Sequence, residues 1–149
     1  MSWCMSSRPQ TLAYGHNDSP IGLAAWIVDK FRVWSDCEGE VERRFRKDDL
    51  LTNVMVYWLT ETIASSARLC YEDVRSAPQL KPGQRIDVPT AVTLFPRDFT
   101  RPPRAIAERF LTIVRWTVLP AGGHFTALEE PGYFAAELGA FAAAVRHSS

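Results

Sequence analysis

The chain opens with a polar lead-in that is followed by a strong helical pattern. Residues 1–19 contain Pro, Gly, Asn, Asp and Ser at close intervals, which predicts irregular structure with turns. Ser19 is a favourable N-cap, and Pro20 suits the first helical position, where no N–H donor is needed. The apolar residues that follow share one helical stripe and comprise Leu23, Ile27, Phe31 and Trp34. We therefore expect a helix over residues 20–35 that buries this stripe.

A second apolar stretch extends from Asp49 to about Glu72 and contains neither Gly nor Pro. Acidic residues at its start favour the positive end of a helix dipole. Its apolar residues occupy more than one helical face and include Leu50, Leu51, Val54, Met55, Tyr57 and Trp58. A helix with this pattern packs against more than one partner. Residues 1–75 thus predict a helical layer, which ends at a linker of turn-forming residues over 76–84.

The second half of the chain predicts alternating strands and helices. Residues 86–96 and 112–120 are short apolar runs rich in β-branched side chains, which are typical of buried strands. A short helix over 102–110, capped by Thr100, is expected between them, and a last helix is expected to start at Pro131. The apolar stripe of that last helix comprises Phe134, Leu138, Phe141 and Val145. This alternation predicts a parallel α/β sheet.

Two parallel strands are too few for a sheet that is stable alone in water. Three or more strands, with both faces covered, are the usual minimum. The helical half supplies apolar surface but predicts no strand of its own. The sequence therefore predicts the C-terminal part of a larger α/β domain.

Composition and charge narrow the class of protein. The 149 residues are 46% apolar, and 17 basic residues balance 17 acidic ones, which excludes a disordered chain and gives no charge signature for nucleic acid. The sequence contains neither a signal peptide pattern nor an apolar stretch long enough for a membrane segment. Cys4, Cys37 and Cys70 lie far apart and form neither a metal ligand set nor a disulfide framework. We expect a soluble cytoplasmic protein.

Two polar side chains follow the two predicted strands directly. Asp98 comes after the first strand, and His124 lies on a glycine-rich turn after the second. Functional groups in open α/β sheets collect beyond the carboxyl ends of the strands. An acid that orients an imidazole, and an imidazole that activates water or a nucleophile, form two parts of a nucleophile–base–acid arrangement. Two plainer interpretations stay open, in which Asp98 caps the short helix and His124 is an ordinary turn residue.

Four segments carry a resemblance to a known family: RPQTLAYGHNDSPIGLAAWIVDKF, DDLLTNVMVYWLTETIASSARL, VPTAVTLFPRDF and RWTVLPAGGHFTALEEP. Together they resemble the C-terminal part of epoxide hydrolases of the α/β-hydrolase superfamily, in the branch that includes the microsomal-type enzymes. The resemblance implies a partial α/β-hydrolase fold. Residues 1–75 would be a segment of the helical lid, 76–84 the linker, and 85–149 the last two strands and helices of the core.

The resemblance also implies a reaction. In that family an aspartate attacks an oxirane carbon, and lid tyrosines hold and protonate the departing oxygen. A histidine, steered by an acid, then activates water to hydrolyse the alkyl-enzyme ester and release a vicinal diol. The histidine of the family's GGHF turn corresponds to His124, and the acid corresponds to Asp98. The substrate would be a small hydrophobic epoxide, and the chemistry needs no metal or organic cofactor.

The chain also departs from the family pattern. Nothing in it matches the nucleophilic aspartate or the oxyanion-hole residues, which lie upstream in the family, so we expect no useful turnover from this chain alone. Cys70 stands where the family has a lid tyrosine, and a thiol is a weak donor. Tyr71, beside it, is the candidate replacement for substrate binding and requires a shift of helix register.

Two alternatives to an epoxide hydrolase stay open. The first is a noncatalytic truncated product that associates with a partner, either as a homo-oligomer or with the missing N-terminal part. The second is a fragment of a haloalkane dehalogenase or an esterase, because both use the same histidine and acid. Sedimentation and dye binding test the first alternative, and the identity of the nucleophile, which lies upstream in the family, distinguishes the second.

Overall fold

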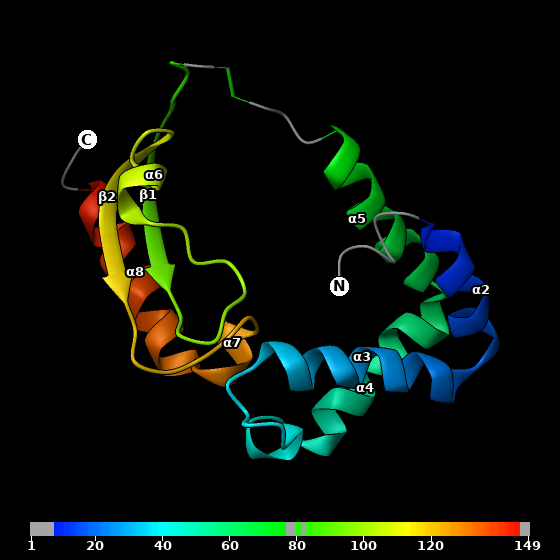
Figure 1. Ribbon diagram of the computed structural model, residues 1–149. Coiled ribbons are helices and arrows are strands. Elements are labelled where there is room, and N and C mark those ends of the chain that lie inside the picture. The colour runs from blue at the N-terminus through cyan, green and yellow to red at the C-terminus, as the bar shows by residue number, and fades with distance from the viewer. Residues whose placement is uncertain (1–7, 77–79, 82, 147–149) are drawn as a thin grey trace. The chain divides into compact units, whose positions relative to one another are not determined.

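The computed structural model describes residues 8–76, 80–81 and 83–146. Helices dominate the first half, and two strands with their connecting helices form the second (Figure 1). The elements are α2 (Pro9–Asp18), α3 (Pro20–Trp34), η1 (Val41–Arg43), α4 (Lys47–Thr60), α5 (Ile63–Ser76), β1 (Ile86–Leu94), α6 (Arg104–Ala107), β2 (Leu111–Val118), α7 (Thr126–Glu129) and α8 (Pro131–Arg146). In the described part of the chain, no helix has the length and apolar character that crossing a bilayer requires.

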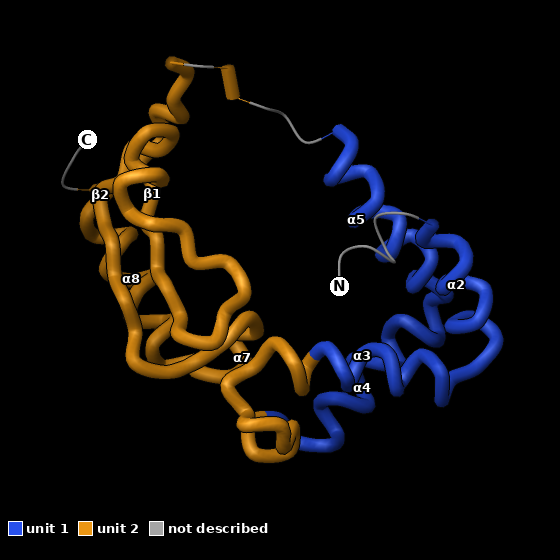
Figure 2. The backbone as a smooth tube through the Cα atoms, viewed as in Figure 1, with its two compact units in different colours: residues 1–30, 45–79 blue, residues 31–44, 80–149 orange. Residues whose placement is uncertain are grey.

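The chain divides into two compact units (Figure 2). The first contains residues 1–30 and 45–79, and the second contains residues 31–44 and 80–149. The contacts thus group residues 31–44 with the sheet. The assignment of residues 1–75 to a lid stays a prediction.

The lead-in to α3 is helical, so the expectation of irregular structure there is wrong for residues 9–18. Pro9 stands at the start of α2, where its missing N–H is not needed. Pro9 and Ala13 are buried, and α2 packs against α5. Tertiary packing therefore outweighs the low helix propensity of Gly15 and Asn17.

The α3 helix is confirmed as expected. Ser19 caps it, because its Oγ accepts the Gly22 N–H at 3.1 Å. Leu23 is fully buried, and Ile27 and Phe31 are less than a tenth exposed. The predicted apolar stripe is therefore the buried face of α3.

The single helix expected from Asp49 to Glu72 is instead two helices, α4 and α5. Glu61 ends α4 in the left-handed conformation, with φ of 54°. The Thr62 N–H donates to the Tyr57 carbonyl at 3.2 Å, and the Glu61 N–H donates to the Trp58 carbonyl at 3.3 Å. These two bonds form a Schellman motif, which satisfies the last carbonyls of α4 without a glycine.

The sheet of the second unit consists of β1 and β2, which pair in parallel as predicted. The pairing is irregular between Ile86 and Pro89, since proline lacks a ladder donor. The strands are half-buried rather than buried, and Ile86 and Val88 are exposed. A two-stranded sheet leaves its edges and part of its faces uncovered, which explains this difference.

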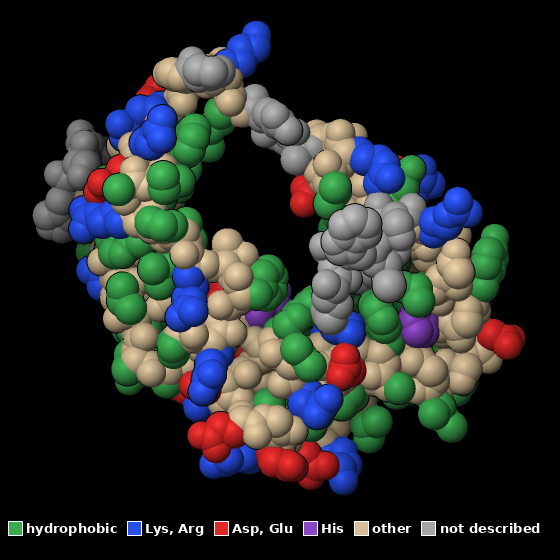
Figure 3. Space-filling model, viewed as in Figure 1, with side chains coloured by type: hydrophobic (Ala, Val, Ile, Leu, Met, Phe, Trp, Pro, Cys, Tyr) green, Lys and Arg blue, Asp and Glu red, His purple; other side chains and the backbone are tan. Residues whose placement is uncertain are grey.

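The helices around the sheet differ in part from expectation. The α6 helix is only four residues long, and its N-cap is Pro103 rather than Thr100. The α7 helix was not expected. The α8 helix starts at Pro131 as predicted, but 42% of Phe134 and 58% of Leu138 are exposed. Figure 3 shows hydrophobic side chains at the surface of both units.

An ion pair fastens α8 to β2. Arg115 donates to the Glu137 carboxylate through Nε and Nη2, each at 2.7 Å. Thr117 Oγ1 donates to the same carboxylate at 2.8 Å. The hydrogen bonds from Arg115 hold the pKa of Glu137 below its ordinary value. This pair fixes the helix that follows the His124 turn.

Candidate active site

Asp98 lies in a tight turn directly after β1. Its N–H donates to the Phe95 carbonyl at 3.3 Å, and the Arg97 N–H donates to the Gly122 carbonyl at 3.1 Å. The second of these bonds joins the turn after β1 to the turn after β2. The α6 helix begins only at Arg104, so Asp98 does not cap it. The plainer interpretation of Asp98 is therefore wrong.

Two glycines allow the turn that carries His124. Gly122 has a φ of +104°, and a Cβ atom there would lie 2.8 Å from the Phe95 ring. A Cβ atom on Gly123 would lie 2.5 Å from the Trp34 carbonyl oxygen. The His124 N–H donates to that same carbonyl at 2.8 Å. The turn is therefore held tightly against the C-terminal end of α3.

The structure brings Asp98 and His124 together. Asp98 Oδ1 lies 3.2 Å from His124 Nδ1, within hydrogen-bond distance. The side chains are 26% and 37% exposed, so the pair is open to water. When Nδ1–H donates a hydrogen bond to Asp98, Nε2 keeps a lone pair that can take a proton from water. The geometry thus sets a carboxylate acceptor against one ring nitrogen of an imidazole and leaves the other ring nitrogen available.

Aromatic side chains surround the His124 imidazole. Its ring centroid lies 4.4 Å from that of Phe99, and 5.3 Å from those of Trp34 and Phe125. Phe99 and Phe125 were not among the predicted site residues. Each directly follows one member of the pair in the sequence, and this adjacency is the signal that could have identified them. Their rings restrict how the imidazole can turn.

Tyr71 and Cys70 lie in the first unit, on α5. Cys70 is exposed. Tyr71 is half-buried, and the Arg75 guanidinium lies 3.7 Å from the centre of its ring. Adjacent positions of a helix point about 100° apart, so the two side chains differ in direction. A role for Tyr71 in substrate binding stays a prediction.

Neither the other two cysteines nor the potential metal ligands indicate a second candidate site in the described part of the chain. Cys37 is buried in the second unit, whereas Cys4 lies outside the described residues. Over residues 8–76, 80–81 and 83–146, no cluster of three or more His, Cys, Asp or Glu residues is arranged to hold a metal ion.

Another histidine, His16, lies on α2 in the first unit. Its ring packs against Trp26, with 5.3 Å between the centroids. Burial lowers the pKa of His16, because a charged imidazolium loses hydration there. We expect this imidazole to be neutral at pH 7.

Comparison with curated proteins identifies the relatives of the chain. A putative epoxide hydrolase of Stigmatella aurantiaca is 42% identical over 134 residues, which is 89% of this chain and 30% of the relative. Epoxide hydrolase 1 of Oryctolagus cuniculus is 35% identical over 142 residues, which is 89% of this chain and 31% of the relative. The chain thus spans about 30% of the length of these curated relatives. No family model matches the chain.

The fold of the chain is also similar to that of solved epoxide hydrolase structures. The crystal structure of the juvenile hormone epoxide hydrolase of the silkworm Bombyx mori superposes with a TM-score of 0.82 at 32% identity. The superposition covers 94% of this chain and 39% of that one. In sequence and in fold, the chain corresponds to the C-terminal part of an epoxide hydrolase of the α/β-hydrolase superfamily.

Proposed function

We propose that this chain carries the general base of an epoxide hydrolase centre, His124, together with its orienting acid, Asp98. The observation that supports this most strongly is the 3.2 Å contact between Asp98 Oδ1 and His124 Nδ1. Both side chains follow the carboxyl ends of paired parallel strands, where α/β folds collect their chemistry. The relatives are named epoxide hydrolases, which favours this reaction over dehalogenation or ester hydrolysis.

The proposed reaction has two steps. In the first, a carboxylate outside these 149 residues attacks an oxirane carbon, the ring C–O bond breaks, and the oxygen takes a proton from a lid donor. In the second, His124 Nε2 removes a proton from water, and the water oxygen adds to the carbonyl carbon of the resulting ester. The ester C–O bond then breaks, and the imidazolium returns its proton to the departing oxygen, which releases a vicinal diol. The carboxylic acid that remains loses its proton, which restores the carboxylate and reprotonates the lid donor. Asp98 stabilises the imidazolium that forms in this second step.

The side chains around the pair support a hydrophobic epoxide as substrate. Phe99 is 63% exposed beside His124, so it offers apolar surface at the site. Tyr71 is the candidate donor to the departing oxygen, because its phenol is a stronger donor than the Cys70 thiol. This role for Tyr71 requires a shift of helix register, because the resemblance places Cys70 at the family's lid tyrosine position.

The exposed apolar surface of the second unit is evidence for a further segment that packs on it and supplies the nucleophile. In the described residues, β1 pairs only with β2. A groove of about 310 Å³ lies between β1 and α8, and its lining includes Phe95, Phe134 and Leu138. Such a face is typical of a sheet that continues with further strands. We propose that the N-terminal part of an epoxide hydrolase, which carries the nucleophile, completes this sheet.

A fusion tests the proposal. The part of the Stigmatella relative that this chain does not span is joined ahead of the 149 residues, and diol release from styrene oxide is measured. We expect the chain alone to release no diol above background, because the ester cannot form without its carboxylate. The fusion is expected to turn over styrene oxide.

Single substitutions in the fusion then assign the roles. His124→Ala is expected to lower steady-state diol release by about a thousandfold or more, since members of a triad act as a unit. Asp98→Asn is expected to lower it less than His124→Ala. Asp87→Asn removes an exposed carboxylate from β1 and is the matched control. Diol release by the 149-residue chain alone, or an active fusion that tolerates His124→Ala, would contradict the proposal.

A further inference from the structure

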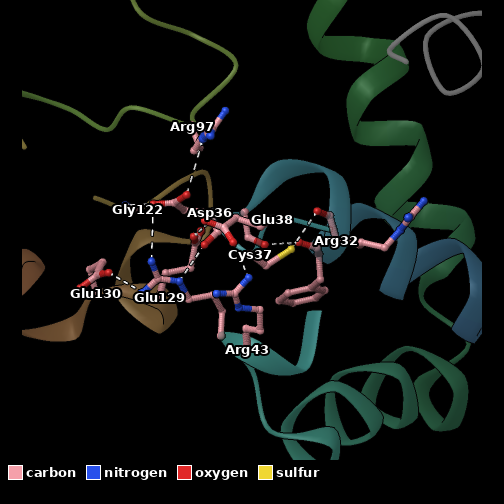
Figure 4. A network of polar contacts seen from close by, with 12 residues as sticks. Arg32, Asp36, Cys37, Glu38, Arg43, Arg97, Gly122, Glu129 and Glu130 are labelled. Atoms are coloured by element: carbon pink, nitrogen blue, oxygen red, sulfur yellow. Dashed lines mark hydrogen bonds and ion pairs between the residues drawn. The ribbon is translucent and has the colours of Figure 1, made fainter. Parts of the chain in front are cut away.

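We propose that Glu129 and Asp36 are positioning residues that hold the His124 turn against the Asp98 turn. This inference rests on the proposed function, because it concerns how the imidazole is kept ready to activate water. Both carboxylates lie in the second unit, and Figure 4 shows them at the centre of a network that joins the segment after α3 to the turns after β1 and β2. Neither carboxylate stands out in the sequence.

Glu129 joins two segments that are far apart in the chain. Its side chain is buried, with 7% of the residue exposed. Oε1 accepts the N–H of Phe125 at 2.9 Å, and Oε2 accepts the N–H of Asp36 at 2.7 Å. Because Phe125 directly follows His124, one of these bonds fixes the backbone beside the imidazole. The other fixes the segment that follows α3.

The Asp36 side chain contacts both the His124 turn and the Asp98 turn. Its Oδ2 accepts the Gly122 N–H at 3.1 Å, two residues before His124. Its Oδ1 lies 3.6 Å from Arg97 Nε, one residue before Asp98. One carboxylate therefore contacts the neighbours of both members of the pair.

Three backbone N–H groups of the His124 turn donate to acceptors outside the turn. The His124 N–H donates to the Trp34 carbonyl at 2.8 Å, between the Gly122 and Phe125 bonds. Backbone donors at 122, 124 and 125 are thus all bound by residues 34–36 or by Glu129. A catalytic geometry can lose about a hundredfold in rate when a group shifts by roughly 1 Å. The network is placed to prevent such a shift.

The two positions require carboxylates rather than amides. Both oxygens of Glu129 face N–H donors, and a glutamine has only one acceptor atom with an NH₂ group opposite it. Glu129→Gln would therefore bring two donors together at one of the two contacts, with almost no change of volume. At Asp36 one oxygen accepts the Gly122 N–H and the other forms the 3.6 Å ion pair with Arg97, so Asp36→Asn turns its NH₂ group towards one of these donors and removes the charge of the ion pair. These substitutions test the hydrogen bonds while leaving the packing in place.

Glu130→Gln is the matched control. Glu130 is the next residue, and its Oε1 accepts Arg44 Nη1 at 2.7 Å. A glutamine there can keep this bond through its amide oxygen while losing the same charge. A difference between the variants at 129 and 130 therefore reports the backbone bonds rather than net charge.

Single-turnover kinetics on the fusion with styrene oxide separate ester formation from ester hydrolysis. We expect Glu129→Gln and Asp36→Asn to slow ester hydrolysis by about tenfold or more, with ester formation unchanged. We expect Glu130→Gln to stay within twofold of the parent.

A second measurement uses the 149-residue chain itself. In ¹⁵N spectra, we expect His124 to change from one imidazole tautomer in the wild type to a mixture of both in Glu129→Gln. A residue that only stabilised the fold would leave that tautomer unchanged.

Each outcome decides the proposal. Glu129→Gln and Asp36→Asn variants that hydrolyse the ester within twofold of the parent, while His124→Ala is slow, overturn the positioning role and leave the proposed function intact. A Glu130→Gln variant as slow as Glu129→Gln also overturns it. If Glu129→Gln loses its helical circular dichroism, the less buried Asp36→Asn decides alone. Unchanged ester hydrolysis in His124→Ala overturns the proposed function itself.

Discussion

Single residues show where sequence reasoning succeeds at this site. Asp98 and His124 could be predicted to meet, because each follows a strand and neighbouring parallel strands end at the same edge of a sheet. Glu129 and Asp36 could not, because their partners are backbone N–H groups, which every residue but proline has. A hydrogen bond to backbone over 93 residues of separation leaves no pattern in the sequence.

The Asp98–His124 contact makes a prediction about one proton. At pH 8.5, where an imidazole is neutral, we expect His124 to carry its proton on Nδ1, because Asp98 offers only acceptors. Long-range ¹H–¹⁵N correlation spectra of the chain report this tautomer directly. Asp98→Asn can present its NH₂ group to Nδ1, so we expect the Nε2–H tautomer to gain population. The same tautomer ratio in wild type and Asp98→Asn would show that the carboxylate does not orient the ring.

At the scale of elements, local patterns predicted the existence of helices and strands better than their ends. The stripe on α3 was sufficient because that face is buried, and the β-branched runs indicated β1 and β2 although both strands are only half-buried. The break between α4 and α5 was not predicted, because it occurs at Glu61 in a left-handed conformation that glycine usually adopts, and the stretch contains no glycine. The α2 helix was missed because its stability comes from packing on α5.

The helix break allows a test by substitution. Glu61→Gly is expected to stabilise the first unit by about 1 kcal/mol, because glycine adopts a positive φ without the steric cost of a Cβ atom. Glu61→Ala removes the same side chain and keeps the Cβ, so it is expected to leave stability almost unchanged. Urea unfolding followed by circular dichroism measures both. A gain of equal size in Glu61→Ala would attribute the effect to lost charge rather than to backbone strain.

At the scale of the whole molecule, the number of predicted strands indicates that the chain is part of a larger α/β domain. Two parallel strands indicated a larger sheet, and the relatives are about three times as long as the matched region. The exposed residues Phe134 and Leu138 on α8 agree with this inference, because a strictly solvent-facing helix would not place large apolar groups there. What the sequence could not provide was how much of each strand stays exposed, since that depends on how the helices of the second unit cover the sheet.

Mass spectrometry of the alkyl-enzyme ester in the fusion tests the central claim most directly. After mixing with excess styrene oxide, His124→Ala fusion protein is expected to gain the mass of one styrene oxide on the N-terminal part and to keep it, because water is no longer activated. The parent fusion is expected to lose this adduct within one turnover as diol appears. If His124→Ala clears the ester as fast as the parent, the imidazole on this chain does not serve as the base, and the account is contradicted.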